Sequence, residues 1–122
     1  MDPREFVASL KTSIQEVVDS EVSQMGSRIP SEIPDGPSRF AYLDRFAAWF
    51  QKLADADKET ARDLLRFTAE GGLFATLTYL DNLATLVPGQ GRFELWHVAD
   101  GDRRLLNDPD GDLLIDLFND LP

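Results

Sequence analysis

The sequence contains no cysteine, which excludes disulfides, thiolate metal ligands and cysteine nucleophiles. It has no apolar run of transmembrane length, and its first residues, MDPREFVASL, lack the basic start and apolar stretch of a signal peptide. The lack of cysteine favours a reducing compartment. The lack of a long apolar run argues against a membrane-spanning protein. We therefore expect a cytoplasmic protein.

Basic residues are scarce, because 12 lysines and arginines stand against 22 acidic residues, and the formal net charge is −10. From Asp100 to Asp120, seven aspartates accompany only Arg103 and Arg104, so this segment carries half of the net charge. Such a charge opposes binding to nucleic acid and to anionic membranes. It favours a basic protein partner.

Catalytic motifs are also missing, since the sequence has no P-loop, no GxGxxG and no HExxH. The single histidine, His97, lies among apolar neighbours and belongs to no recognisable triad motif, which favours a structural role over that of a general base. We expect no cofactor and no enzymatic activity. A metal-dependent enzyme that uses the aspartate cluster is kept as a third hypothesis.

The length of 122 residues and the 43% of hydrophobic residues fit a single folded domain, 1–122. Apolar residues at steps of three and four predict an amphipathic helix from Asp2 or Pro3 to about Met25. A proline-rich linker, SRIPSEIPDGPS, follows. A second helix is expected from Pro37 or Ser38, with an apolar stripe of Tyr42, Leu43, Phe46, Trp49, Phe50 and Leu53. We expect this stripe to face the core, the alternative being a ligand pocket or a partner groove.

A third helical pattern begins near Asp57 and extends to Val87, with Gly71 and Gly72 in its middle. Each glycine costs roughly 1 kcal/mol relative to alanine, so we expect a break or kink there, the alternative being close packing of another backbone. The stretch after the glycines is apolar on nearly every side, which predicts an enclosed helix. Its polar strip includes Asp81, either a solvent-facing residue or a polar contact in a binding cleft.

The dipeptide Asp100-Gly101 lies between FELWHV and RRLLN and predicts a β-hairpin with a type I′ turn. A two-residue turn pairs Trp96 with Leu105 and His97 with Arg104. Both faces then carry apolar residues and need cover, because an isolated hairpin is marginal in water. The outer edge is a candidate for pairing with another chain, and it could support a homodimer.

The segment NDPDGDLLIDLFND resembles a calcium loop in its alternating aspartates, but neither register places both the glycine and the final glutamate of an EF-hand. We favour a turn that starts at Asp108 and leads into a short helix from about Asp110 to Asn119. Aspartates there are expected to cap the free N–H groups of the helix. A looser calcium site remains as an alternative, formed by Asp108, Asp110, Asp112 and Asp116.

These patterns predict a predominantly helical α+β fold, with three to four packed helices, a C-terminal β-hairpin and a short terminal helix. Over residues 71–120, the segments GLFATLTYLDNLA, GRFELWHV and LLNDPDGDLLIDLFND resemble a group of small, largely uncharacterised bacterial proteins with the same ending. The resemblance implies a bacterial origin and a common fold. It implies no particular activity.

The size and the charge are comparable to those of immunity proteins, which neutralise toxin domains. We therefore predict a protein-binding module. Its most specific form is an immunity-type inhibitor whose acidic C-terminal surface covers a basic toxin or nuclease domain. The second hypothesis is a structural or regulatory protein that self-associates through the hairpin edge. The residues predicted to contact a partner are Asp81, Trp96, Asp100, Asp102, Asp110, Asp112, Asp116 and Asp120.

Overall fold

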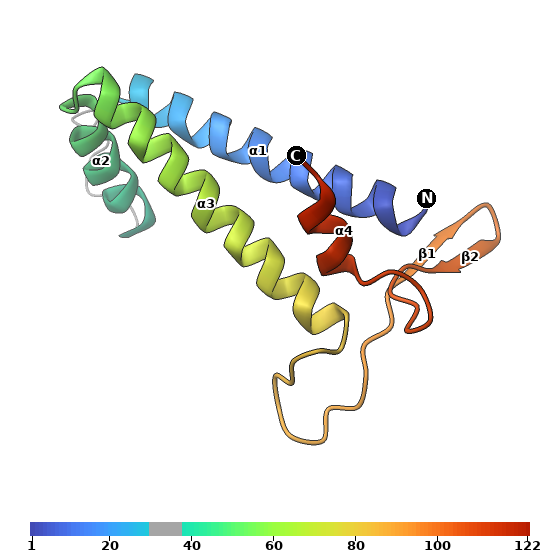
Figure 1. Ribbon diagram of the computed structural model, residues 1–122. Coiled ribbons are helices and arrows are strands. Elements are labelled where there is room, and N and C mark those ends of the chain that lie inside the picture. Colours follow the sequence, from blue (N-terminus) through green and yellow to red (C-terminus); the bar gives the residue numbers. More distant parts are fainter. Residues whose placement is uncertain (30–37) are drawn as a thin grey trace. The chain divides into compact units, whose positions relative to one another are not determined.

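The computed structural model describes residues 1–29 and 38–122 (Figure 1). Over these residues the fold is predominantly helical α+β with a hairpin and a short last helix, which confirms the predicted class. The greater part of the predicted linker lies outside the described residues. The elements are α1 (Pro3–Ser27), α2 (Ser38–Gln51), α3 (Asp55–Leu80), β1 (Trp96–Ala99), β2 (Asp102–Leu105) and α4 (Leu114–Asp120).

The chain divides into two compact units, one formed by Met1–Ile14 with Ala69–Pro122 and the other by Gln15–Thr68. The first unit, called unit 1 below, has a core of Val7, Leu73, Leu77, Leu114, Leu117 and Phe118. The second, unit 2, buries the apolar residues Val18, Val22, Ala47, Phe50 and Ala61. No helix among the described residues is long and apolar enough to cross a bilayer.

Helix α1 begins where the sequence predicts, at a reciprocal cap between Asp2 and Glu5. The Glu5 N–H donates to Asp2 Oδ1 at 2.8 Å, and the Asp2 N–H donates to Glu5 Oε2 at 2.9 Å. These two bonds satisfy donors that the first helical turn leaves free, and Pro3 in the first turn has no N–H to satisfy. The helix ends at Ser27, two residues beyond the expected end.

Helix α2 forms as expected, but only part of its predicted core stripe is covered, namely Leu43, Phe50 and Leu53. Phe50 is buried, whereas Tyr42, Phe46 and Trp49 are about half exposed. The buried face lies to one side of the stripe and includes the small residue Ala47, which sequence periodicity does not distinguish from a solvent-facing alanine. Apolar periodicity thus identified the helix but placed its covered face incorrectly.

Helix α3 runs through Gly71 and Gly72 without a break, so the expected break or kink is wrong. The alternative of a closely packed backbone is also wrong, because a Cβ atom at either glycine would meet no atom within 4 Å. Two glycines cost about 2 kcal/mol of helix stability, which the burial of Leu73 and Leu77 in the unit 1 core can offset.

Helix α3 ends at Leu80 rather than at Val87, because Asn82 adopts a left-handed conformation with φ of 59°. The Leu83 N–H donates to the Thr78 carbonyl at 3.1 Å, and the Asn82 N–H donates to the Tyr79 carbonyl at 3.0 Å. This pair of bonds is the Schellman motif, in which asparagine can replace glycine. The prediction of an enclosed helix is therefore wrong, because the helix stops at Leu80 and because Phe74, Ala75 and Thr76 within it are exposed.

The hairpin register is confirmed, since Trp96 pairs with Leu105, His97 with Arg104 and Val98 with Arg103. Asp100 and Gly101 have φ of 51° and 82°, as a type I′ turn requires. The expectation that both faces are covered is wrong, because Trp96 and Val98 are exposed. The Arg103 guanidinium lies 4.6 Å from the Trp96 ring centroid, which partly shields that ring.

Helix α4 begins at Leu114, four residues after the expected start. The predicted turn at Asp108 is confirmed by a 3.0 Å bond from the Gly111 N–H to the Asp108 carbonyl. The predicted caps are wrong, because the N-cap residue is Leu113 and none of the neighbouring aspartates caps this helix. The buried side chains Leu114, Leu117 and Phe118 attach α4 to the unit 1 core.

Candidate protein interface

Asp81 supplies the missing cap of α4 from a distance of more than thirty residues along the chain. Its Oδ1 and Oδ2 atoms accept from the N–H groups of Leu114 and Ile115, each at 2.9 Å. A carboxylate also suits the positive end of a helix. Asp81 is half-buried and fixes α4 to the end of α3, which is a structural role that neither sequence interpretation included.

Asn107 is a buried polar residue, only 4% exposed, at the centre of a second set of cross-links. Its Oδ1 accepts from the Leu95 N–H at 2.8 Å, and its Nδ2 donates to the carbonyls of Phe93 and Leu80. One amide therefore holds the segment before β1, the segment after β2 and the end of α3. Burial of this group is tolerated because both its donor and its acceptor are satisfied.

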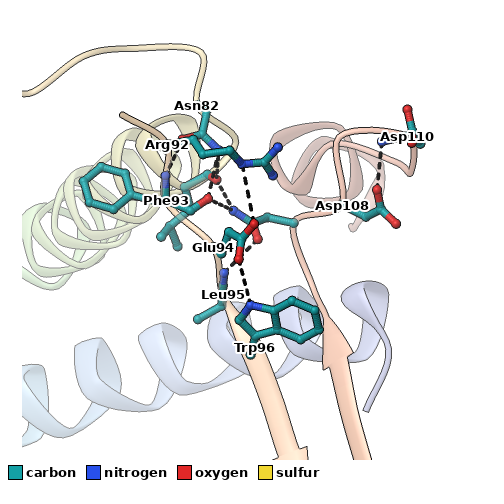
Figure 2. Close-up of polar contacts among 10 residues, drawn as sticks. Asn82, Arg92, Phe93, Glu94, Leu95, Trp96, Asp108 and Asp110 are labelled. Carbon is teal, nitrogen blue, oxygen red and sulfur yellow. Dashed lines mark hydrogen bonds and ion pairs between the residues drawn. The ribbon is translucent and has the colours of Figure 1, made fainter. Parts of the chain in front are cut away.

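Asn82 closes the base of the loop between α3 and β1 (Figure 2). Its Oδ1 accepts from the Phe93 N–H at 2.6 Å, and its Nδ2 donates to the Phe93 carbonyl at 3.1 Å. The two ends of a loop of about a dozen residues are thereby held together, as in an Ω-loop. We call residues 83–92 the Asn82 loop, and Figure 1 shows it as the long coil beyond α3.

The tip of the Asn82 loop is ordered by Gln90. The Gln90 Oε1 accepts from the N–H groups of Leu86 and Val87 at 2.8 and 3.2 Å, and the Gln90 N–H donates to the Val87 carbonyl. Despite this order, Leu86 and Val87 are 57% and 58% exposed, and Leu83 is similarly exposed. The loop thus holds three large apolar side chains in water on a hydrogen-bonded backbone.

The Asn82 loop also forms one wall of an apolar hollow of about 320 Å³. Leu86 lines it from the loop, and Phe93 lines it from the segment that follows. Residues on the last turns of α3 complete the lining, namely Thr76, Tyr79 and Leu80. The hollow has room for an apolar side chain of a partner.

The aspartates predicted to contact a partner are all exposed except Asp81. Asp100 lies in the hairpin turn, Asp102 begins β2, Asp110 and Asp112 belong to the turn before α4, and Asp116 and Asp120 lie on α4. Among the described residues, Asp120 lies 3.6 Å from Arg4, whereas most of the other aspartates form no ion pair with a basic side chain. Trp96 is 39% exposed, and its Nε1 donates to Glu94 (Figure 2).

The acidic segment is not uniformly negative at its surface. A hollow of about 580 Å³ is lined by Asp108 and Asp112 together with Arg4, Arg103 and Arg104. Asp108 is further engaged by the Asp110 N–H at 3.0 Å, as a turn aspartate should be. Outside this hollow, the exposed aspartates without an ion pair among the described residues include Asp100 and Asp102 on the hairpin, Asp110 in the turn and Asp116 on α4.

Within residues 1–29 and 38–122, no three histidine or carboxylate side chains come together as metal ligands. The aspartates of the alternative calcium site are among the described residues. His97 is half-buried on β1 and pairs across the hairpin with Arg104. The described residues therefore assemble no metal centre of three such ligands.

Comparisons of the chain with protein-family models, with curated proteins and with solved structures found no match.

The residues that build this region were missed in the sequence, although one signal was present. An asparagine directly after Asp81 is compatible with a left-handed helix end, and it would have shortened α3. No local signal identifies Asn107, since its partners lie 12 to 27 residues away along the chain. Gln90 bonds to residues only three and four positions away, but the helical interpretation of this segment concealed its role. The predicted contact residues and the Asn82 loop both belong to unit 1.

Proposed function

We propose that the protein is a non-catalytic protein-binding module whose main contact surface is the Asn82 loop. The observation that carries this proposal is the exposure of Leu83, Leu86 and Val87 on a loop fixed at its base and tip. Clustered apolar side chains are rarely left in water without a partner, and function is concentrated on loops that a rigid scaffold positions. Binding to an ordered loop also loses less conformational entropy.

The exposed aspartates provide the second component, which is attraction of a basic partner. Asp100, Asp102 and Asp116 are exposed and belong to the same unit as the loop. Their charge would accelerate the encounter and make it sensitive to salt, whereas the apolar loop would set the lifetime of the complex. An immunity-type inhibitor of a basic toxin or nuclease domain is the specific form that we propose. Asp81 is left out of this surface because both its oxygens serve α4.

A test requires loop variants that keep the fold. The double variant Leu86→Ser, Val87→Ser removes exposed apolar groups, and Val17→Ser, Leu64→Ser is its matched control on exposed positions of unit 2. Partners captured from the source cells by the wild type are identified and purified, and their affinities are then measured. We expect the loop variant to lose at least about a hundredfold in affinity, equal to about 2.7 kcal/mol, and the control to lose little.

The electrostatic component has its own test on the same purified partner. We expect Asp102→Lys and Asp116→Lys to lower the association rate at low salt and to reduce its salt dependence, with a smaller effect on dissociation. Equal affinities for the loop variant and its control would contradict the loop proposal. Unchanged association rates in both lysine variants would contradict only the basic-partner component.

Self-association is the second candidate, and it is favoured by one observation. The sheet has only two strands among the described residues, and Val98 on β1 is exposed.

Since Trp96 is partly exposed, Trp96→Ala should cost less than the 3 to 5 kcal/mol typical of a buried aromatic truncation. A concentration-dependent dimer in sedimentation that this variant dissolves would support the second candidate. A monomer at all concentrations would exclude it.

A further inference from the structure

A separate apolar surface lies on α2 in unit 2. Tyr42, Phe46 and Trp49 follow one another at steps of four and three residues, so they lie on one side of the helix. Each is about half exposed, and the ring centroids of Tyr42 and Phe46 are 6.2 Å apart. We call these three residues the α2 aromatic stripe.

The side of α2 opposite to solvent is already used within unit 2. Phe50 and Ala47 are buried, and Asp44 binds Arg28 Nε at 2.7 Å. Gln51 also donates to the carbonyls of Met25 and Arg28 at the end of α1. The helix is thus held by its other face, and the aromatic stripe is not needed for that attachment.

Positive charge borders the α2 aromatic stripe. Among residues 42–53 the charged side chains are Asp44, Arg45 and Lys52, and Asp44 is the one engaged with Arg28. Arg45 and Lys52 are exposed, each three residues after a stripe aromatic. Arg45 lies on α2, and Lys52 directly follows its last residue in a turn closed by the bond from the Lys52 N–H to the Trp49 carbonyl. The Arg45 guanidinium lies 4.8 Å from the Tyr42 ring centroid. This border of the stripe is basic in a chain whose net charge is −10.

We propose that the α2 aromatic stripe binds an amphipathic helix of a partner protein, with acidic residues beside its apolar face. A helix laid along α2 would cover the three aromatic side chains and place its carboxylates opposite Arg45 and Lys52. This site is distinct from the Asn82 loop. Its partner is acidic, whereas the partner proposed for the Asn82 loop is basic.

Charge also decides against the other occupants. A second copy brings a second charge of −10, and an antiparallel pair of α2 helices sets the basic flanks against each other. An anionic membrane is an extended surface that meets the net charge of −10 of the chain, whereas a short helix meets only the surface of α2. An acidic helix is the occupant that satisfies both the aromatic and the basic part of the surface.

The test uses Trp49 as its own reporter. The chain has two tryptophans, so Trp96→Phe leaves only Trp49 to fluoresce. The probe is a synthetic helical peptide of 14 residues with a leucine stripe flanked by glutamates, and the comparison peptide carries lysines instead. We expect the glutamate peptide to shift Trp49 emission to shorter wavelength and to bind at least about tenfold more tightly than the lysine peptide.

Charge variants sharpen the test. Arg45→Glu with Lys52→Glu should reverse the preference between the peptides, whereas Arg92→Glu with Arg104→Glu changes the total charge equally and should not. Equal binding of both peptides, or no binding of either, would overturn the proposal. A Trp49 shift with anionic phosphatidylserine vesicles but with neither peptide would also overturn it. So would a dimer of the chain that Phe46→Glu dissolves.

Discussion

Helices α2 and α4 are both rich in apolar residues, but they use them differently. The seven residues of α4 bury Leu114, Leu117 and Phe118 in the unit 1 core. The fourteen residues of α2 leave three aromatic side chains half exposed. Length and hydrophobicity alone would rank α2 as the better-anchored helix. The difference shows that an apolar face is a core face only where other elements of the fold cover it.

The two helices also differ in their polar attachments. Helix α4 is too short to be stable alone, and Asp81 satisfies its first N–H groups from the end of another helix. Helix α2 is attached by the part-buried pair of Arg28 with Asp44 and by the Gln51 bonds, besides its buried Ala47 and Phe50. We therefore expect mutations to destabilise the protein most around α4 and least on the stripe of α2.

The largest expected effect is in the unit 1 core. Leu77 is fully buried against α4 and α1, so Leu77→Ala should lower the free energy of unfolding by about 2 to 5 kcal/mol. Trp49→Ala, on the exposed stripe, should cost less than about 1.5 kcal/mol although it removes more atoms. Urea unfolding followed by circular dichroism measures both. A larger cost for Trp49→Ala than for Leu77→Ala would show that the aromatic stripe of α2 is part of a core.

The second effect is at Asn107. Asn107→Ala leaves the Leu95 N–H without its acceptor in a part-buried site, and it removes one of the two donors to each of the Phe93 and Leu80 carbonyls, which also accept from Asn82 Nδ2. This change should cost about 1 to 3 kcal/mol. Asn119→Ala, at an exposed position of α4, is the matched control and should cost little. Equal stabilities of the two variants in urea would show that the Asn107 network does not hold the fold.

The third effect is at the remote cap. Asp81→Ala should destabilise the protein by about 1 to 2 kcal/mol because it frees two N–H groups at the start of α4. Asp110→Ala should change stability by less than about 0.5 kcal/mol, since that side chain caps no helix. Thermal and urea unfolding compare the pair. If Asp110→Ala were the more costly, the cap would come from the local turn, as the sequence suggested.

The smallest effect is a gain in stability. Gly71→Ala and Gly72→Ala place a methyl group in open space on a continuous helix, so each should raise the free energy of unfolding by about 0.5 to 1 kcal/mol. Urea midpoints at an unchanged slope would show it. A loss of stability in both variants would mean that the helix requires flexibility at these glycines.

Local chemistry in the sequence predicted several parts of this structure. The start of α1, the hairpin register and the Asp108 turn depend on residues near one another in the chain, and all three are confirmed. The end of α3 is set by the local conformation of Asn82, but the apolar pattern of the following residues outweighed that signal. The cap of α4 and the exposure of α2 depend on contacts between distant segments. Those predictions failed because periodicity and turn preference contain no information about which faces meet.

The candidate surface shows the same difference between features that neighbouring residues determine and features that distant contacts determine. The aspartates near the C-terminus were apparent as a charge pattern, and the structure leaves those predicted contacts exposed, while their binding role stays a prediction. The Asn82 loop was instead assigned to a helix, because Leu83, Leu86 and Val87 continue the apolar pattern of α3. A left-handed asparagine and one buried amide convert that pattern into an exposed loop.

The proposed function requires the Asn82 loop to be ordered in the free protein, and amide hydrogen exchange can measure that order. The N–H groups of Leu86, Val87 and Phe93 donate to the side chains of Gln90 and Asn82. We predict exchange at least about tenfold slower than in an unstructured chain for these three amides, and loss of that protection at Leu86 and Val87 in Gln90→Ala. Exchange at the unstructured rate in the wild type would show that the apolar side chains lie on a flexible connection and not on a preformed interface.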